Sequence, residues 1–332
     1  MNTIPDISLD AYLHHKKIDP ALTFLVEKIA ASSVAVAQHL DQAALHSQIG
    51  SAGTTNIQGE DQKLLDVLAD CVFRETCAQA PSLAAYVSEE VEDVTWLKDP
   101  VGGDLILYVD PLDGSSNLGV NLSVGSIFAV AQVHADGDRN VLRQGREYLC
   151  AGYAIYGPST LFVISFGVGV AGFTLDPSDG SLKLTNARMQ IPPETGEFAV
   201  NLSRRRFWDE PIRRYVDECL AGSAGTRGRN FNMRWTASMV ADVHRILTGG
   251  GIFLYPADEA NRSSGGKLRL MYEANPMAFL VNAAGGLAST GYEDILLVQP
   301  QSHHQRISVL LGSSDEVRRL VQFNQAQVEI AS

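Results

Sequence analysis

The chain has 332 residues, of which 45% are hydrophobic and 19% are charged. This balance is typical of a soluble globular protein, and at roughly 150 residues per domain the length predicts about two domains. The net charge of −12 argues against a broad surface for nucleic acid or for an anionic membrane. An acidic chain that handles an anionic substrate must gather arginine, lysine or bound metal locally.

The first residues, the longest apolar run and the cysteines all indicate a cytoplasmic protein. The first residues lack the basic and apolar regions of a signal peptide. The longest apolar run, residues 161–173, is too short to span a bilayer and contains three glycines. The four cysteines form no CxxC pair and no zinc spacing, so reduced thiols are expected.

Helices are predicted first along the chain. Residues 20–46 have apolar side chains at helical spacing, and Pro20 suits a first-turn position. A second amphipathic helix is predicted from about Glu60. Asp66 and Asp70, four residues apart, share a face away from its apolar stripe. A carboxylate on that face is either solvated or directed into a site.

Short strands then follow, and the Pro192-Pro193 pair is the best candidate for a linker between two parts. Strands are predicted at residues 85–88, 105–109, 126–133, 152–156, 161–166, 172–175 and 182–185. Beyond the linker, strands at 198–201, 251–255 and 307–311 alternate with helices at 209–220, 236–247 and 276–284. The pattern predicts a mixed α/β class in which sheets and helices form layers.

Two glycine-rich segments resemble phosphate-binding motifs but lack essential features. Residues 167–172 fit GxGxxG, yet a strand and a turn follow where the dinucleotide fingerprint needs a helix. Residues 263–268 resemble the end of a P-loop, but the upstream glycine is missing and Leu268 replaces the required Ser or Thr. Neither motif therefore predicts the site.

Carboxylates at the ends of predicted strands make a stronger pattern. Glu89 and Glu90 follow one strand, Asp110 ends the next, and Asp113 comes three residues later. Carboxylates that converge without a cation repel one another and are neutralised. Hard divalent cations bind oxygen ligands, and two such ions about 3.5–4 Å apart form a phosphoryl-transfer site. The pattern favours a magnesium site.

The glycine and serines after Asp113 fit the same interpretation. Backbone N–H groups of Gly114, Ser115 and Ser116 can hold phosphate oxygens in a nest-like turn. The alternative is an acidic surface turn, because Asp, Pro and Gly all favour turns. The nearby glutamates shift the balance toward the metal site.

Longer motifs resemble a known family. SEE at 88–90 and DPLDGSSN at 110–117 resemble the metal motifs of the lithium-sensitive phosphatase superfamily. GIFLYP at 251–256, GKLRLMYE at 266–273, NPMAF at 275–279 and HQR at 304–306 resemble class 1 fructose-1,6-bisphosphatase of the bacterial type. The resemblance runs from about residue 20 to residue 325 and implies a layered α/β/α/β/α sandwich of the sugar phosphatase type.

The resemblance also implies an activity and a division of the chain. The activity is hydrolysis of the 1-phosphate of D-fructose 1,6-bisphosphate by magnesium-activated water, giving fructose 6-phosphate and phosphate. Residues 1–193 form the metal-binding part and residues 194–332 the part that binds the sugar and the 6-phosphate. A sedoheptulose-1,7-bisphosphatase side activity stays open, as does the choice between gluconeogenesis and the Calvin cycle. The alternatives are an inositol monophosphatase-like enzyme and an inert homologue.

Site residues carry over from the family's motifs. Two or more Mg²⁺ per subunit, for which Mn²⁺ can substitute, are implied to bind Glu89, Asp110, the Leu112 carbonyl, Asp113 and Glu273. Glu90 and Asp66 are implied to orient or deprotonate the attacking water. Glu60 fits an acidic position after a mobile loop, residues 51–58.

Substrate contacts carry over in the same way. Besides residues 113–116, the family implies that Asn201, Tyr255 and Lys267 hold the sugar and its second phosphate. Arg234 matches an arginine that reaches into a neighbouring subunit's site, which implies a homotetramer. Trp235 and Arg204 stand where many relatives carry tyrosines that touch the 6-phosphate, so the contact pattern there stays open.

Departures from the family concern its regulatory nucleotide site. The turn before the first helix differs at residues 17–20, Asp104 stands where relatives have lysine, and Gln132 replaces an arginine. Because Asp104 would repel phosphate, we expect inhibition by AMP to be weak or absent.

Overall fold

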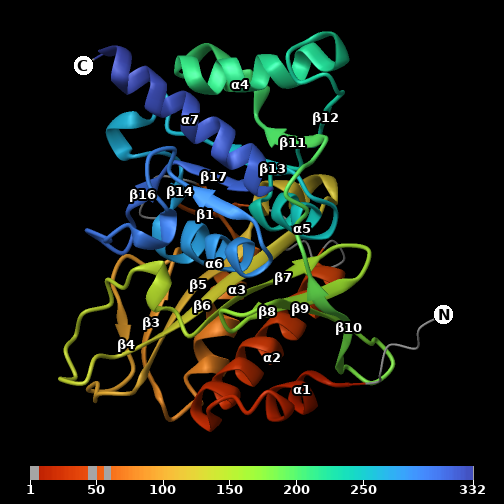
Figure 1. The fold of residues 1–332 in the computed structure, drawn as a ribbon. Helices are drawn as coiled ribbons and strands as arrows, with labels where there is room; N and C mark the ends of the chain where they lie inside the picture. The colour runs from red at the N-terminus through yellow and green to blue at the C-terminus, as the bar shows by residue number, and fades with distance from the viewer. Residues whose placement is uncertain (1–6, 44–50, 56–60, 332) are drawn as a thin grey trace.

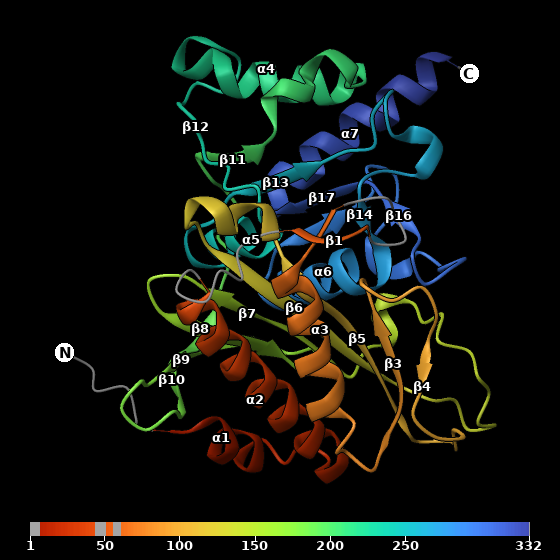
Figure 2. The ribbon, with the colours of Figure 1, turned by 180° about the vertical axis from the view of Figure 1, so that it is seen from behind.

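The computed structural model describes residues 7–43, 51–55 and 61–331. Helices and sheets alternate in five layers (Figures 1 and 2). Helices α1–α3 cover one face of an eight-stranded sheet, α5 and α6 lie between this sheet and a five-stranded one, and α4 and α7 cover the far side. The predicted α/β/α/β/α sandwich is therefore confirmed.

The first helical layer comprises α1 (Leu9–His15), α2 (Pro20–Gln42) and α3 (Leu64–Cys77). The Asp19 side chain accepts hydrogen bonds from the N–H groups of Ala21 and Leu22, so α2 begins at Pro20 as predicted. It ends at Gln42 rather than residue 46.

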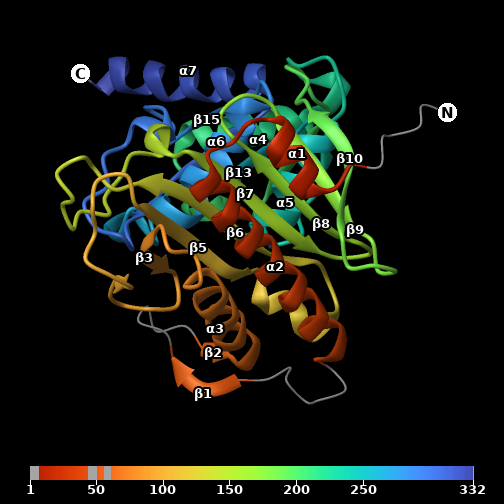
Figure 3. The ribbon, with the colours of Figure 1, turned by 90° about the horizontal axis from the view of Figure 1, so that it is seen from below.

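The predicted start of α3 near Glu60 was wrong, because residues 61–63 form a strand. This strand, β2 (Asp61–Lys63), pairs with β1 (Ser51–Thr55), so part of the expected loop at 51–58 is extended chain. Figure 3 shows the pair beside α3 at the edge of the molecule. Glu60 and residues 56–58 lie outside the described residues.

Helix α2 is the one helix among the described residues that is long and apolar enough to cross a membrane. Its Leu25, Val26 and Ile29 are fully buried in the core that also contains Phe73 of α3. With 56% of its most apolar window buried, α2 is a core helix of the fold.

The eight-stranded sheet has the order β10-β9-β8-β7-β6-β5-β3-β4. Neighbouring strands in this sheet are all antiparallel to each other except β3 and β5, which are parallel. Its strands are β3 (Leu83–Ser88), β4 (Thr95–Trp96), β5 (Leu105–Asp113), β6 (Val124–Gln132), β7 (Cys150–Tyr156), β8 (Thr160–Ser165), β9 (Val170–Leu175) and β10 (Leu182–Met189). The sequence predicted each of these strands except β4.

The five-stranded sheet has the order β12-β11-β13-β17-β15 and carries the second half of the chain. Its strands are β11 (Glu197–Val200), β12 (Asn232–Met233), β13 (Ile252–Tyr255), β15 (Leu287–Ser289) and β17 (Val309–Gly312), while β14 (Leu268–Arg269) pairs with β16 (Arg306–Ile307). The helices are α4 (Glu210–Ala221), α5 (Met239–Gly249), α6 (Asn275–Ala283) and α7 (Ser314–Ala331), with short helical turns at Ser115–Val120, Leu202–Phe207 and Leu270–Ala274 among others.

Three apolar cores hold the layers together. One lies between α1–α3 and the large sheet, a second surrounds α5 and α6 between the two sheets, and a third lies under α4 and α7. All four cysteines are free, and Cys77, Cys150 and Cys219 are buried in these cores. Reduced thiols stay a prediction.

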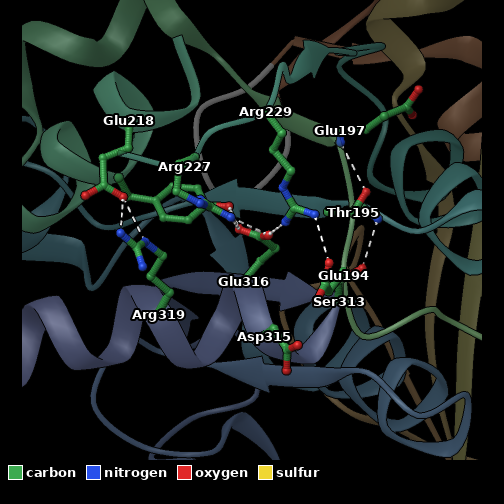
Figure 4. Close-up of polar contacts among 12 residues, drawn as sticks. Glu194, Thr195, Glu197, Glu218, Arg227, Arg229, Ser313, Asp315, Glu316 and Arg319 are labelled. Atoms are coloured by element: carbon green, nitrogen blue, oxygen red, sulfur yellow. Dashed lines mark hydrogen bonds and ion pairs between the residues drawn. The ribbon is translucent and has the colours of Figure 1, made fainter. Parts of the chain in front are cut away.

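A buried ion-pair network fastens α7 to the segment that follows α4 (Figure 4). The Glu316 carboxylate is buried and accepts hydrogen bonds from Tyr215 Oη at 2.7 Å, Arg227 Nη2 at 2.6 Å and Arg229 Nη2 at 2.7 Å. Arg229 also pairs with Glu194 just after the predicted linker. Two arginines and a tyrosine thus surround a single carboxylate.

Candidate active site

A pocket of about 400 Å³ brings together residues from both halves of the chain. Nearly all the residues that the sequence singled out line it, and two further residues are discussed below. Lining residues from that set are Asp66, Glu89, Glu90, Asp110, Leu112, Asp113, Gly114, Ser115, Ser116, Asn201, Tyr255, Lys267 and Glu273. The pocket therefore combines a carboxylate-rich part, here called the acidic end, with residues at strand ends of the smaller sheet.

Strand β5 supplies the aspartates of the acidic end. The sequence predicted that it ends at Asp110, but it continues to Asp113. Asp110 lies opposite Ile127 of β6 and Asp113 lies opposite Gly125, with a register shift between them. An irregularity of this kind changes the direction of the side chains that follow it. Here Asp110 and Asp113 both reach the pocket.

Asp113 is also bound to the start of α5. Its carboxylate accepts hydrogen bonds from Ser238 Oγ at 2.6 Å and from the N–H groups of Met239 at 3.2 Å and Val240 at 2.9 Å. Gly114 adopts a φ of 76°, and a Cβ there would lie 2.6 Å from the Cβ of Ser238. Only glycine lets this turn lie so close to α5.

The acidic end has the chemistry of a divalent cation site. Oxygens of Asp110, Asp113 and Glu273 lie within 4.8 Å of one another. Burial raises the pKa of Asp113 to about 6 and, with the charge of Glu89, raises the pKa of Glu273 to about 8. Burial and the neighbouring acids raise the pKa of Asp110 as well. Such a cluster needs protons or a cation, and these oxygen donors fit a hard divalent ion.

Arg269 is a buried neighbour of this cluster that the sequence did not single out. Its Nη1 lies 2.9 Å from Glu89 Oε1 and 3.9 Å from Glu273 Oε2, and its backbone N–H donates to Glu273 Oε2 at 2.6 Å. A signal was present, because Arg269 is the one basic residue in the apolar run 268–272. Its single charge offsets only part of the acidic cluster.

Asp66 and Glu90 reach the pocket from two different elements. Both Asp66 and Asp70 of α3 are buried, so the solvated alternative for their face was wrong. Asp70 accepts hydrogen bonds from Tyr86 Oη at 2.9 Å and from Ser88 Oγ at 2.6 Å. Because Ser88 Oγ in turn accepts from the N–H of Glu90, Asp70 fixes the end of β3 against α3. This anchor sets Asp66 and Glu90 beside the same pocket.

The remaining residues of the pocket are polar and aromatic. Asn201 follows β11, Tyr255 ends β13, and Lys267 precedes β14. Trp235 stacks on Phe253 with ring centroids 5.8 Å apart, and both line the pocket. Lysine, amide and hydroxyl groups in one pocket with a carboxylate cluster suit a substrate with two anionic groups.

Comparisons with known proteins agree over nearly the whole chain. Models of the N-terminal and C-terminal domains of fructose-1-6-bisphosphatase match residues 2–187 and 191–325. The class 1 fructose-1,6-bisphosphatase of Methylobacillus flagellatus is 48% identical over 312 residues, which are 93% of this chain and 94% of that protein.

Solved structures give the same result. Leishmania major fructose-1,6-bisphosphatase in its holo form is 33% identical, with a TM-score of 0.91 over 97% of this chain and 100% of that one. Its apo form is 31% identical, with a TM-score of 0.83 over 96% and 99% of the two chains. This chain belongs to the class 1 fructose-1,6-bisphosphatase family. Its activity is fructose-1,6-bisphosphatase activity, the hydrolysis of a phosphoric monoester in carbohydrate metabolism. The predicted family and activity are confirmed, and the inositol monophosphatase alternative is set aside.

Two of the residues that the sequence singled out, Glu60 and Arg234, are not among the described residues that line the enzyme's pocket. Glu60 lies outside the described residues. Arg234 is half exposed and lies outside the pocket, where its Nε is 4.0 Å from Glu197 Oε1 and its Nη1 donates to the carbonyl oxygen of Met233. Within one subunit, other residues therefore line the pocket in place of Arg234.

Other lining residues were missed because they come from distant segments. Ser238 and Asp242 of the α5 region line the pocket, and burial raises the pKa of Asp242 to about 6. Asp242 accepts hydrogen bonds from the N–H of Thr236, which shapes the turn before α5. No local pattern in the sequence marks these residues, because their proximity to Asp113 arises only when α5 packs against β6 and β7.

Proposed function

We propose that the enzyme hydrolyses the 1-phosphate of fructose 1,6-bisphosphate at the acidic end of this pocket. The observation that carries the proposal is the buried, under-neutralised cluster of Asp110, Asp113 and Glu273 in the same pocket as Lys267 and Asn201. Glu89 and the Leu112 carbonyl complete the proposed donor set for two or more Mg²⁺ per subunit, and Mn²⁺ can substitute. When bound, these ions neutralise phosphate charge and lower the pKa of water.

The chain's own residues orient the reactants. Glu90 and Asp66 lie beside the cluster, where they orient the attacking water and accept its proton. The backbone N–H groups of Gly114, Ser115 and Ser116 hold the oxygens of the reacting phosphate at the turn after β5. Water attacks phosphorus in line, so no phosphoenzyme forms. Glu60 is proposed to act from the segment that precedes α3.

The second phosphate and the sugar are proposed to lie at the other end. Asn201, Tyr255 and Lys267 offer an amide, a hydroxyl and an ammonium group there. In this division, residues 1–193 supply most of the metal end and residues 194–332 the sugar end. Glu273 is the exception, because it comes from the second part and joins the cluster of the first.

Arg234 is proposed to complete a neighbouring subunit's pocket in a homotetramer. Its half-exposed side chain at the β12 edge supports this, because the guanidinium lies 4.0 Å from Glu197 and otherwise donates to the carbonyl oxygen of the adjacent Met233. Mixing Arg234→Ala subunits with subunits that carry an inactive metal end tests it. Activity that depends on subunit pairing supports the proposal, and activity that follows the wild-type fraction alone contradicts it.

Four finer properties remain proposals. We propose a cytoplasmic enzyme that serves gluconeogenesis or carbon fixation, with a sedoheptulose-1,7-bisphosphatase side activity. We also propose that AMP inhibits weakly or not at all, because Asp104 keeps a carboxylate where a phosphate would bind. The ion pair of Asp104 with Lys98, at 2.7 Å, occupies the nearest lysine. Micromolar inhibition by AMP would contradict this proposal.

Phosphate release tests the proposed reaction directly. We expect magnesium-dependent release from fructose 1,6-bisphosphate, slower release from sedoheptulose 1,7-bisphosphate, and none from inositol 1-phosphate. Absence of magnesium-dependent release from both bisphosphates would refute the proposal.

A further inference from the structure

We propose that His304 is a positioning residue for the hydrolysis, because it ties the turn of Glu89–Glu90 to the helical turn of Glu273. The inference rests on the proposed roles of these glutamates in holding the metal and orienting the attacking water. The sequence placed His304 in a family motif without giving it a role. His304 is not among the described residues that line the pocket, so it acts through the segments that it joins.

One ring nitrogen of His304 reaches the chain that follows the glutamate pair. Its Nε2 donates to the carbonyl oxygens of Val91 at 3.1 Å and Glu92 at 3.2 Å. Because carbonyl oxygens only accept hydrogen bonds, Nε2 is the nitrogen that carries the proton. The turn of the glutamate pair is thereby held at both ends, since the hydrogen bond from Ser88 to Asp70 fixes the residue before it.

The other ring nitrogen of His304 reaches the helical turn Leu270–Ala274. Tyr272 Oη is hydrogen-bonded to Nδ1 of His304, and Tyr272 directly precedes Glu273 in this turn. Burial and the neighbouring His303 lower the pKa of His304, so the ring is neutral and Nδ1 accepts the hydrogen bond of the phenol. A neutral imidazole, with one donor and one acceptor, therefore satisfies both turns at once.

The two turns need such a tie because they carry acids of one cluster. Burial and the charge of Glu89 raise the pKa of Glu273, which shows that the two acids oppose each other's ionisation. Arg269 joins these acids through its charge, at 2.9 Å and 3.9 Å from their oxygens. His304 joins the backbones behind them and adds no charge. Residues that orient metal ligands in this way change metal affinity by about 10–100-fold.

The alternative is that His304 only fastens a surface loop. The chain offers a matched control, because the adjacent His303 is also partly buried and its Nε2 is hydrogen-bonded to the same carbonyl oxygen of Glu92. Among the described residues, Tyr272 Oη is bonded to His304 and not to His303. The two histidines therefore share one turn, whereas the second turn is reached by His304.

Binding of Mn²⁺ to the metal-free full chain, followed by calorimetry, is the first measurement. His304→Ala should raise the Kd about tenfold, at the lower end of the range for residues that orient metal ligands. His303→Ala should leave the Kd within about twofold. In turnover at saturating Mn²⁺, His304→Ala should lower kcat about tenfold because Glu90 loses its support. The KM for fructose 1,6-bisphosphate should stay within about twofold, because the proposed sugar contacts are untouched.

Two further variants test the bridge itself. His304→Gln should restore part of both values, because its terminal amide can donate to the Val91 carbonyl oxygen from near the position of Nε2. Tyr272→Phe removes the phenol oxygen alone and should raise the Kd for Mn²⁺ by itself. In the His304→Ala background it should add little, because both substitutions break the same bridge. Additive effects would show that the two side chains do not act together.

Defined outcomes overturn the inference. An unchanged Kd and kcat in folded His304→Ala, or equal changes in His303→Ala, assign His304 a purely structural role. If His304→Ala does not fold, Tyr272→Phe takes its place in the comparison with His303→Ala. Glu273→Gln separates this inference from the proposed function. If it too leaves Mn²⁺ binding unchanged, the proposed metal site fails, and if it alone weakens binding, only the role of His304 fails.

Discussion

The structure buries carboxylates in two places and surrounds them with opposite kinds of neighbours. At the acidic end of the pocket, Asp110, Asp113 and Glu273 lie within 4.8 Å of one another, and Arg269 is the buried cation beside them. In the network under α4 and α7, the single carboxylate of Glu316 receives hydrogen bonds from two arginines and a tyrosine (Figure 4).

The difference distinguishes a binding site from a structural ion-pair network, which we call a joint because it holds elements together. A cluster with too few positive neighbours raises the pKa of its acids and leaves room for a cation. A carboxylate surrounded by more positive charge than its own holds elements together and has nothing further to bind. The same residue types thus serve catalysis in one region and architecture in the other, and charge balance distinguishes them.

The largest effect should come from removing one charge at the acidic end. Glu273→Gln keeps the shape of the side chain but removes its charge. We expect turnover of fructose 1,6-bisphosphate to fall by about 10³-fold, which corresponds to about 4 kcal/mol of lost transition-state stabilisation. Steady-state kinetics at saturating Mg²⁺ measure it. Because a pKa of about 8 leaves Glu273 mostly uncharged at neutral pH without metal, the neutral glutamine should not lower the unfolding temperature of the metal-free variant. Near-normal turnover would show that Glu273 is not needed to bind the metal.

The converse substitution in the network should affect stability instead. Glu316→Gln leaves the buried Arg227 without its carboxylate partner, whereas the partly exposed Arg229 keeps Glu194, and breaking a buried pair costs about 3–5 kcal/mol. Urea unfolding should report this loss, while kcat of the folded variant at low temperature stays near that of the wild type. A large fall in kcat with unchanged stability would contradict the structural role given to Glu316.

The sequence predicted much of the acidic end because its residues are close together in the chain. The run 110–116 and Glu89–Glu90 form local motifs, and apolar strands lead into them. The end predicted for β5 was wrong, because a proline such as Pro111 usually stops a strand. The structure tolerates this proline at the register shift, where its carbonyl oxygen accepts a hydrogen bond from Ser126 Oγ at 2.7 Å. Such tolerance depends on β6 and not on the local sequence.

Features built from distant segments could not be predicted in this way. Asp113 and Ser238 are 125 residues apart, and only the packing of α5 brings them within 2.6 Å. Glu316 meets Arg227 across 89 residues. Helix α7 itself was missed, although Val317, Leu320 and Val321, which pack in the third core, recur at helical spacing. Charge balance, which separates the two regions, is therefore visible only in the folded protein.

A smaller effect concerns the pH dependence of the metal-free protein. The pKa of Glu273, about 8 in the fold, lies above its ordinary value of 4.5, and that of Asp113, about 6, lies above 3.8. At pH values between a group's unfolded and folded pKa, the native state binds more protons than the unfolded state. The free energy of unfolding therefore falls as pH rises, by up to about 1.4 kcal/mol per pH unit for each group. Unfolding in chelator from pH 5 to 8 measures this. Glu273→Gln should flatten the slope, and added Mg²⁺ should reduce it. A rise in stability over this range would contradict the raised values.

The smallest effect should come from a partly exposed pair in the same layer as Glu316. Glu218 of α4 lies 2.7 Å from Arg319 of α7, but the arginine side chain is 36% exposed (Figure 4). Because water and side-chain entropy offset such pairs, Glu218→Gln should cost about 1 kcal/mol or less. Urea unfolding alongside Glu316→Gln compares the two directly, since both variants lose one carboxylate that joins α7 to the α4 region. Equal losses would show that the arginine surplus around Glu316 adds nothing to the joint. A much smaller loss of stability in Glu218→Gln would show that Glu316 holds α7 to the α4 region because it is buried among arginines.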